Sequence, residues 1–356
     1  MAAYQHKTTF YRKLACRRSI ISGAAATRAG IAARTRGVGQ EVKLGVAIGR
    51  PLSVQSDTNL VDAFIAHGRR VTEAGVGTLW LGQMYHYDAI TMAALVGQAI
   101  PAEKLRAVGV SVIPINPRHP IEVSAAAQTA QGATRGRFQL GLGLGAPVIE
   151  GPSYGLRVDK PIRRLREYLT TLRQLLDTGT ADFSGETLTV APKFTTLQPG
   201  GENIPVLVAA MAPQALRATG ELADGTIPLH AGPRALSQDI VPVIDGAAER
   251  AGRPRPRVIA GVAVIVTSDP ERVRALAIDD MAFYESIPSY RKVLDAEGVQ
   301  HTGELAIIGD EQHVAKELQR YFDAGATEVF ASHTELGGPE DEARTLALLG
   351  ELSRGN

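Results

Sequence analysis

From residue 42 onward the chain alternates short apolar runs with longer segments whose apolar residues recur at helical spacing. The apolar runs carry Val, Ile, Leu and Ala at consecutive positions, which is typical of strands buried on both faces. The predicted strands cover residues 42–48, 78–83, 106–114, 138–143, 205–210, 225–229, 257–266 and 328–332. The predicted helices cover residues 57–74, 88–100, 120–134, 161–177, 213–223, 233–251, 311–324 and 339–352. Ser56 or Asp57 is the predicted cap of the first helix.

Two segments interrupt this alternation. Residues 179–204 are rich in Gly, Thr and Pro, with a predicted hairpin around residues 183–190, and residues 270–302 form a second, largely helical excursion. Strict alternation of strands and helices suits either an open doubly wound sheet or a closed barrel. Eight βα units in one domain-sized chain favour an α/β fold of the (β/α)8 TIM-barrel type, with insertions after strand 4 and before the last βα unit.

The composition is that of an ordinary globular protein. Apolar residues make up 44% of the 356 residues and charged residues 21%, enough to build a core. The single cysteine, Cys16, allows no internal disulfide, so we expect a reducing, cytoplasmic compartment. No run of 18 apolar residues occurs, so no membrane-spanning helix is predicted.

Residues 1–40 differ from the rest of the chain in charge. They carry eight Lys or Arg and no acidic residue, which leaves 30 basic against 37 acidic residues in residues 41–356. A nucleic-acid site needs its basic patch on the folded domain, so nucleic acid is not an expected partner. The pair Arg17-Arg18 resembles the start of a twin-arginine export signal, and the composition also fits an organelle transit peptide. We favour a disordered extension or a wrongly assigned start, because periodic structure begins abruptly at residue 42, and we assign the folded domain to residues 41–356.

The glycine run 141–146 formally matches the dinucleotide fingerprint G-x-G-x-x-A. That fingerprint requires a helix to open within the run, and the Gly and Pro residues at 147–155 predict an irregular chain until about residue 161. We therefore expect a barrel strand whose carboxyl end needs small residues so that a flat ring can approach the backbone.

Four segments resemble the luciferase-like monooxygenase superfamily, and in particular its branch that uses the deazaflavin coenzyme F420. They read RAVGVSVIPINPRHPIEVSAAAQTAQGATRGRFQLGLGLG (106–145), RRLREYLTTLRQLL (163–176), PVLVAAMAPQALRATGELADGTI (205–227) and AGATEVFAS (324–332). No single motif is decisive, but all four occur in the family's order, and the likeness covers about residues 42–352. The resemblance implies a barrel oxidoreductase that binds F420, with FMN as the alternative cofactor.

The resemblance also implies where the coenzyme binds, at the carboxyl mouth of the barrel. The implied coenzyme-binding residues are Ser111, Val112, Gly143, Gly145, Ala210, Met211, Ala212 and His230. A non-proline cis peptide bond is implied between Ser111 and Val112, and the turn at 210–212 before a helix suits a phosphate. The alternatives are an ordinary strand serine, a generic βα turn and a merely solvated His230.

For proton transfer, the resemblance points to the loop after the second strand, where His86 is the candidate acid–base residue. Asp88 either orients it or caps the next helix, and a structural His86 stays an equal alternative. Sugar-phosphate-oxidising relatives carry a carboxylate and an amide after strand four, whereas residues 145–150 keep only Glu150 as an ionisable group. That argues against a sugar-phosphate substrate. The histidines are scattered, so no metal site is predicted.

The expected function is hydride transfer between F420 and a small or medium organic substrate, by reduction of a C=C, C=N or C=O bond. An FMN-dependent monooxygenase on the same barrel is the near alternative. A non-catalytic cofactor-binding or partner subunit is the alternative from another class. The expected partners are a small-molecule substrate and a second copy in a homodimer, with neither nucleic acid nor membrane.

Overall fold

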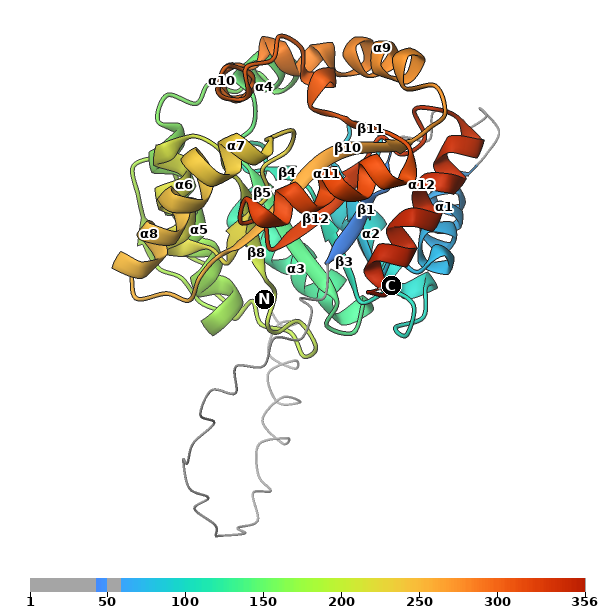
Figure 1. Cartoon of the computed structure of the whole chain (residues 1–356). Coiled ribbons are helices and arrows are strands. Elements are labelled where there is room, and N and C mark those ends of the chain that lie inside the picture. The colour runs from blue at the N-terminus through green and yellow to red at the C-terminus, as the bar shows by residue number, and fades with distance from the viewer. Residues whose placement is uncertain (1–42, 50–58, 356) are drawn as a thin grey trace, which may run out of the picture. The chain divides into compact units, whose positions relative to one another are not determined.

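The computed structural model describes residues 43–49 and 59–355, and within them eight parallel strands close into a barrel (Figure 1). In barrel order these are β1 (Leu44–Ala47), β2 (Thr78–Leu81), β3 (Ala107–Val110), β5 (Phe138–Gly143), β8 (Val206–Ala209), β9 (Gly225–Thr226), β10 (Arg257–Val266) and β12 (Glu328–Ser332). Parallel pairing of β10 with β12 and of β12 with β1 completes the ring. The predicted (β/α)8 barrel is confirmed.

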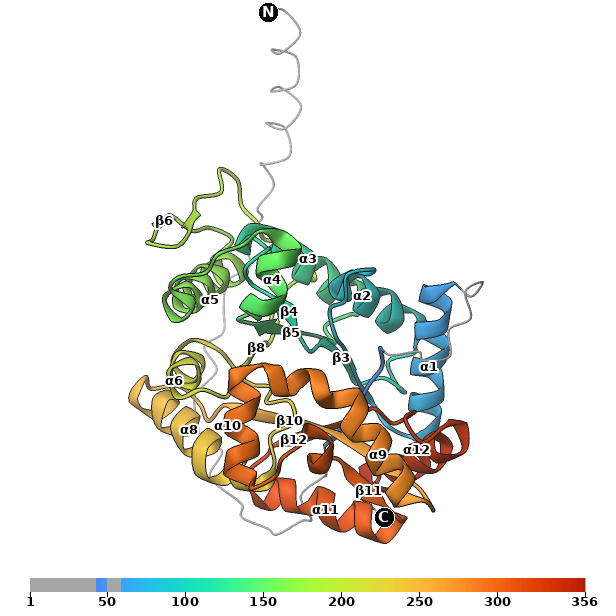
Figure 2. The same ribbon diagram turned by 90° about the horizontal axis from the view of Figure 1, so that it is seen from above.

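Helices surround the strands on the outside, as the alternating pattern predicts (Figure 2). They are α1 (Leu60–Ala74), α2 (Ala89–Ala99), α3 (Pro120–Ala133), α5 (Pro161–Thr178), α6 (Pro213–Leu222), α8 (Val241–Arg250), α11 (Glu311–Asp323) and α12 (Pro339–Ser353). The cap of α1 is Asn59, whose side chain accepts hydrogen bonds from the backbone of Val61 and Asp62. Ser56 and Asp57, the predicted caps, lie outside the described residues.

Both predicted insertions are present. After β5 the chain forms an antiparallel hairpin of β6 (Phe183–Ser184) and β7 (Thr189–Val190). After β10 it forms α9 (Pro270–Met281), a 3-10 turn Ala282–Ser286, α10 (Pro288–Glu297) and β11 (Ile307–Gly309). Figure 2 shows α9 and α10 crossing over β10 and β12 at the carboxyl end of the strands. The three-residue β11, which pairs with the carboxyl end of β10, was not predicted.

Three segments differ from the prediction. The chain after the glycine run is not irregular, because α4 (Pro147–Tyr154) begins with proline in its first turn and ends at Gly155 in a left-handed conformation. The predicted strand 106–114 is split into β3 and β4 (Ile113–Pro114). The predicted helix 233–251 consists of α7 (Pro233–Ala235), a π-helical segment Leu236–Ile240 and α8.

Side chains fill the inside of the barrel. The buried cluster there consists of Trp80, Leu207, Ile227, Ile259 and Phe330. The rings of Trp80 and Phe330 lie 5.8 Å apart between centroids. Glycine is required opposite them: a Cβ at Gly109 would lie 2.5 Å from Trp80, and one at Gly261 would lie 2.3 Å from Phe330. Because the interior is packed, a ligand site is left only at the mouth.

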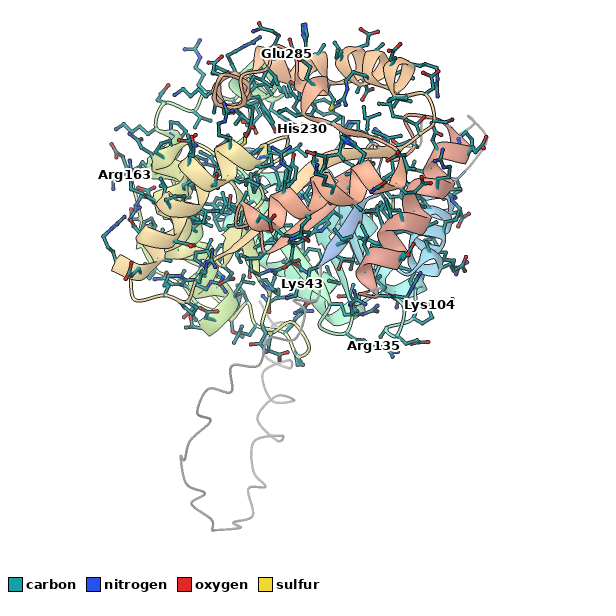
Figure 3. The ribbon with its side chains drawn as sticks, viewed as in Figure 1. Lys43, Lys104, Arg135, Arg163, His230 and Glu285 are labelled. Carbon is teal, nitrogen blue, oxygen red and sulfur yellow. The ribbon has the colours of Figure 1, made fainter. Side chains whose placement is uncertain are left out.

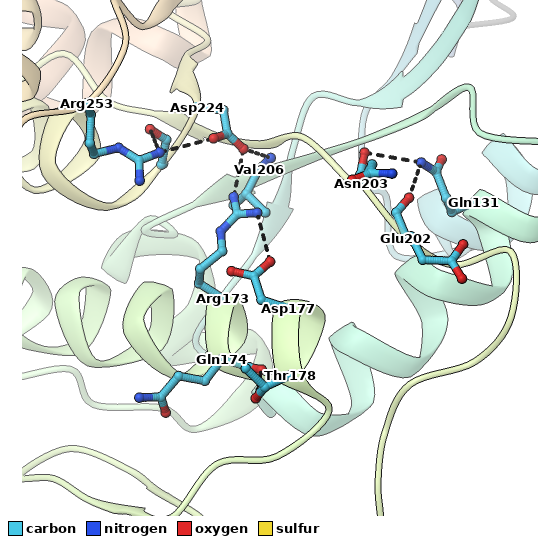
Figure 4. Close-up of polar contacts among 11 residues, drawn as sticks. Gln131, Arg173, Gln174, Asp177, Thr178, Glu202, Asn203, Val206, Asp224 and Arg253 are labelled. Atoms are coloured by element: carbon cyan, nitrogen blue, oxygen red, sulfur yellow. Dashed lines mark hydrogen bonds and ion pairs between the residues drawn. The ribbon is translucent and has the colours of Figure 1, made fainter. Parts of the chain in front are cut away.

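An ionic network centred on Asp224 lies at the amino-terminal end of the barrel. Asp224, before β9, accepts hydrogen bonds from Arg173 of α5 at 2.7 Å, from Arg253 at 3.1 Å and from the backbone N–H of Val206 at 2.8 Å (Figure 4). These bonds tie α5 and the loop after α8 to the amino-terminal ends of β8 and β9, at the end of the barrel away from the mouth. In the described part of the chain, no helix is both long and apolar enough to cross a membrane.

Candidate active site

A cavity of about 200 Å³ opens at the carboxyl ends of the barrel strands. Apolar and aromatic side chains form most of its lining, among them Ile48, Met84, Phe330 and, from the second insertion, Tyr284 and Tyr290. The second insertion therefore contributes part of the cavity wall. The remaining lining residues are Ala47, Gly49, Gly82, Tyr87, Ser111, Val112, Ala209, Ile227, Leu229, Ser332, His333 and Glu335.

The floor of this cavity is the bulge between β3 and β4. The peptide bond between Ser111 and Val112 is cis, at the position that the resemblance implied. Val112 points toward β5, where a Cβ at Gly143 would lie 2.7 Å from its Cγ2, and a Cβ at Gly141 would lie 2.0 Å from the carbonyl oxygen of Val110. The glycines of β5 thus leave room for the bulge itself, which in turn faces the cavity.

A cleft of about 400 Å³ adjoins the cavity, and Val112, Ala209 and Tyr290 are among the residues that line both. The cleft brings together most of the coenzyme-binding residues predicted from the sequence. These are Val112, Gly143, Gly145, Ala210, Met211 and Ala212. Ala212 is the N-cap of α6 and no side chain caps that helix, so backbone N–H groups of its first turn are open to a ligand. A groove lined by Lys292 and Asp239 among others continues past Ala212.

His230 is not solvated, contrary to one of the alternatives. It is 1% exposed and takes a left-handed φ of 54°. Its ring contacts those of Tyr284, at 4.7 Å between centroids, and His333, at 5.7 Å. Figure 3 shows it beneath the insertion that carries Glu285. His230 is not among the residues that line the cavity or the cleft, so its role toward a coenzyme stays a prediction.

His86 lies on the rim rather than in the cavity. Its side chain is exposed and packs edge-on against Tyr87, with ring centroids 5.1 Å apart. Asp88 caps α2 by accepting a 2.8 Å hydrogen bond from the backbone of Thr91, and it pairs with Arg118 at 2.7 Å. Burial would raise the pKa of Asp88, but these bonds outweigh it and hold the pKa below its ordinary value. The described contacts of Asp88 thus support the capping role.

Glu150 supports the loop after β5 instead of facing the cavity. It is 4% exposed, and its Oε2 accepts a 2.6 Å hydrogen bond from Asn116. Burial raises its pKa, partly offset by the Asn116 bond and by Arg164. A Cβ at Gly145 would collide with this carboxyl group at 2.1 Å, which explains the glycine there.

Three polar lining residues were not predicted from the sequence: Ser332, His333 and Glu335. All three stand at or just after the end of β12. Burial raises the pKa of Glu335, because its carboxylate form is poorly solvated there. Catalytic groups of barrel enzymes lie at the carboxyl ends of strands. The polar residues at the end of the predicted strand 328–332 could therefore have been predicted as site residues.

A closed (β/α)8 barrel with a cavity and a cleft at its carboxyl mouth has the architecture in which barrel enzymes build their active sites from the βα loops. The chain belongs to the luciferase-like monooxygenase family, whose model matches residues 42–352. It is thus an enzyme of an oxidoreductase family.

Known relatives agree with this assignment. One of them, provisionally named a coenzyme F420-dependent oxidoreductase of Mycobacterium tuberculosis, is 25% identical over 324 residues, which cover 78% of this chain and 91% of the relative. Among solved structures, an F420-dependent secondary alcohol dehydrogenase in complex with an F420–acetone adduct superposes with a TM-score of 0.71 at 18% identity, over 88% of this chain and 98% of the other. The oxygenating constituent of a Baeyer–Villiger monooxygenase of Pseudomonas putida, in complex with FMN, gives 0.70 at 14% identity, over 89% and 99%. At these identities the two structures show the fold alone.

Proposed function

We propose that the protein is a coenzyme F420-dependent oxidoreductase that transfers a hydride between this deazaflavin and a carbonyl or similar unsaturated group of a small or medium organic substrate. The observation that carries the proposal is that the cavity and the cleft adjoin and share lining residues. Together they extend from an apolar pocket above Ser111 and Val112 to the uncapped first turn of α6.

The residues present fit a coenzyme with a flat ring and a phosphate. On the ring side, a Cβ at Gly82 would meet nothing closer than the carbonyl oxygen of Ser111 at 3.7 Å, so the glycine leaves the floor open to a planar group. On the phosphate side, the backbone N–H groups after Ala212 and the dipole of α6 suit an anion. Bound deazaflavin would supply a hydride donor with carbon in place of the reactive ring nitrogen of a flavin, which favours hydride transfer over oxygen activation.

The cavity lining indicates the class of substrate. Ala47, Ile48, Met84 and Phe330 favour an apolar body, whereas the polar residues after β12 suit one carbonyl or hydroxyl group. Tyr284 and Tyr290 would exclude water from the reacting atoms. We therefore expect ketones or secondary alcohols with apolar substituents as substrates, as in the relative that holds an F420–acetone adduct.

The second candidate function is an FMN-dependent monooxygenase, which the FMN-bound structural relative favours. Anaerobic mixing of the protein with reduced F420 and a panel of apolar ketones distinguishes the two. Our proposal expects oxidised F420 and alcohol to form in equal amounts without oxygen. Oxygen consumption with reduced FMN, and no oxidation of F420 by any ketone, would contradict it. A bound coenzyme without turnover would instead support the partner-subunit alternative.

A further inference from the structure

A group of polar side chains lies where the second insertion meets the last barrel strand. Asp280 is the next-to-last residue of α9, and Ser332 and His333 stand at the carboxyl end of β12. Nε2 of His333 lies 3.3 Å from Oδ2 of Asp280, and Nδ1 lies 2.9 Å from Oγ of Ser332. One imidazole therefore links a carboxylate of the insertion to a hydroxyl of the barrel.

The backbone at His333 has a conformation that few residues adopt. Its φ of 55° is in the left-handed region, where glycine is least strained and His, Asn and Asp are tolerated better than most residues. The side chain is 9% exposed. The chain thus holds an imidazole, fixed at both nitrogens, at a position where glycine would be less strained. Such backbone positions concentrate at functional sites.

Ser332 and His333 face the substrate space. Both line the cavity, together with Glu335, and these three form the polar corner of an otherwise largely apolar and aromatic lining. At this corner the Ser332 hydroxyl is placed to donate a hydrogen bond to a substrate carbonyl in the cavity. His86, by contrast, is exposed on the rim.

We propose that His333 is the catalytic acid–base residue of this site, with Ser332 carrying the proton to the substrate and Asp280 positioning the imidazole; this rests on the hydride transfer proposed above. In the reducing direction, a hydride from the reduced deazaflavin adds to the carbonyl carbon, and the π electron pair of C=O moves onto the oxygen. That oxygen takes the proton of the Ser332 hydroxyl, which is restored by the Nδ1 proton of the His333 imidazolium. The imidazole regains its proton from solvent. The ketone is reduced to an alcohol and the coenzyme is oxidised.

Other titratable groups near the imidazole define the competing assignments. His230 after β9 and Asp280 of α9 contact it, and Tyr284 of the 3-10 turn, Tyr290 of α10 and Glu335 after β12 line the same cavity. Burial raises the pKa of Tyr290 and that of Glu335, which favours their neutral forms. Glu335 is accordingly the other group of the polar corner able to donate a proton.

Steady-state reduction of a ketone by the holoenzyme tests the assignment. His333→Asn, chosen because asparagine tolerates a left-handed backbone, should lower kcat by at least about 100-fold while the coenzyme Kd stays within about twofold. The wild-type kcat should fall as pH rises and the imidazolium loses its proton, and this alkaline limb should be absent from the variant. His313→Asn, on the exposed face of α11, is the matched control and should behave as wild type.

Two results would overturn the assignment. One is a His333→Asn enzyme that keeps kcat within about threefold and retains the alkaline limb. The other is loss of that limb in Glu335→Gln or His86→Asn while His333→Asn keeps it, which would give the proton to Glu335 or His86.

A second measurement does not depend on turnover. In coenzyme-free protein, the NMR signal of the His333 Nε2–H should be that of a hydrogen-bonded proton in wild type, and this signal should be lost in Asp280→Ala, because Nε2 then loses the Asp280 oxygen 3.3 Å away. An unchanged Nε2–H signal in Asp280→Ala would overturn the positioning role of Asp280. If no coenzyme binds to the wild-type protein, the proposed function fails, while this signal still decides the pairing of His333 with Asp280.

Discussion

At the scale of single residues, a substitution at Ala212 should change the stability of α6 and the affinity for the coenzyme in opposite directions. It is the N-cap of α6 and has no capping side chain, so an acidic residue there would both cap the helix and face the cleft. Ala212→Asp should raise the free energy of unfolding of the coenzyme-free protein by about 0.5–2 kcal/mol. It should weaken coenzyme binding by more than about tenfold, because its charge repels the phosphate.

Ala212→Ser is the matched control, since serine caps the helix without adding charge and should leave coenzyme affinity within about twofold. Urea unfolding measures the free energy of unfolding, and equilibrium titration measures the coenzyme Kd. Equal affinity of Ala212→Asp and wild type would mean that the phosphate binds elsewhere.

The sequence predicted the positions of single residues well where the backbone conformation requires a particular residue type. The bulge at Ser111 and Val112 and the small residues of β5 belong to one packed unit, so the family resemblance located them together. The polar residues after the predicted strand 328–332 were a local signal for Ser332 and His333. Their link to Asp280 could not be predicted, because Asp280 comes from an insertion far away in sequence. The exposed rim position of His86 could not be foreseen either, since it depends on how the loop 83–88 is held by hydrogen bonds from Gln83.

At the scale of elements, the strands were predicted closely because burial on both faces leaves continuous apolar runs, as in β5 and β10. The elements that were not predicted are short or have an irregular sequence pattern. The helix α4 carries the Gly and Pro residues that usually signal a loop, and β11 is only three residues long. The local sequence pattern predicts secondary structure least reliably where contacts with neighbouring elements decide the conformation.

The first insertion depends on one buried carboxylate. Glu167 of α5 accepts hydrogen bonds from the backbone N–H groups of Glu186 and Thr187, at 3.0 and 2.9 Å, and from the hydroxyl of Thr187 at 2.6 Å. Burial would raise its pKa, but these hydrogen bonds outweigh burial and hold the pKa below its ordinary value. A lowered folded-state pKa means that this stabilisation is present above the unfolded-state value, roughly 4.3, and is lost as pH falls through the folded-state value.

Glu167→Gln should therefore lower the free energy of unfolding at pH 7 by about 1–3 kcal/mol and should flatten its decline below about pH 5. Urea unfolding between pH 7 and pH 3 measures both effects. Glu351→Gln, exposed on α12, is the control and should change neither. A Glu167→Gln protein with the wild-type acid dependence would show that the carboxylate does not hold the hairpin.

At the scale of the whole molecule, the two ends of the barrel differ in what they carry. The mouth carries the cavity, whereas the opposite end carries the Asp224 network shown in Figure 4. This division predicts that disrupting the network unfolds the protein more easily without affecting the coenzyme. The predicted division at residue 40, the homodimer and the cytoplasmic location stay predictions, and residues 1–40 lie outside the described part of the chain.

Asp224→Asn should lower the free energy of unfolding by about 1–3 kcal/mol, because Arg173 and Arg253 lose the carboxylate that they share. The coenzyme Kd should stay within about twofold. Asp182→Asn, in the exposed first insertion, is the control for removal of an acidic residue. A large loss of coenzyme affinity in Asp224→Asn would show that the two ends of the barrel are coupled.

We propose above all that this barrel mouth binds a deazaflavin. Equilibrium titration of the coenzyme-free protein with F420 and with FMN, under one set of conditions and followed by absorbance and fluorescence, tests it most directly. We predict that F420 binds at least about tenfold more tightly than FMN, a difference of about 1.4 kcal/mol. Tighter binding of FMN, or binding of neither coenzyme, would contradict the account.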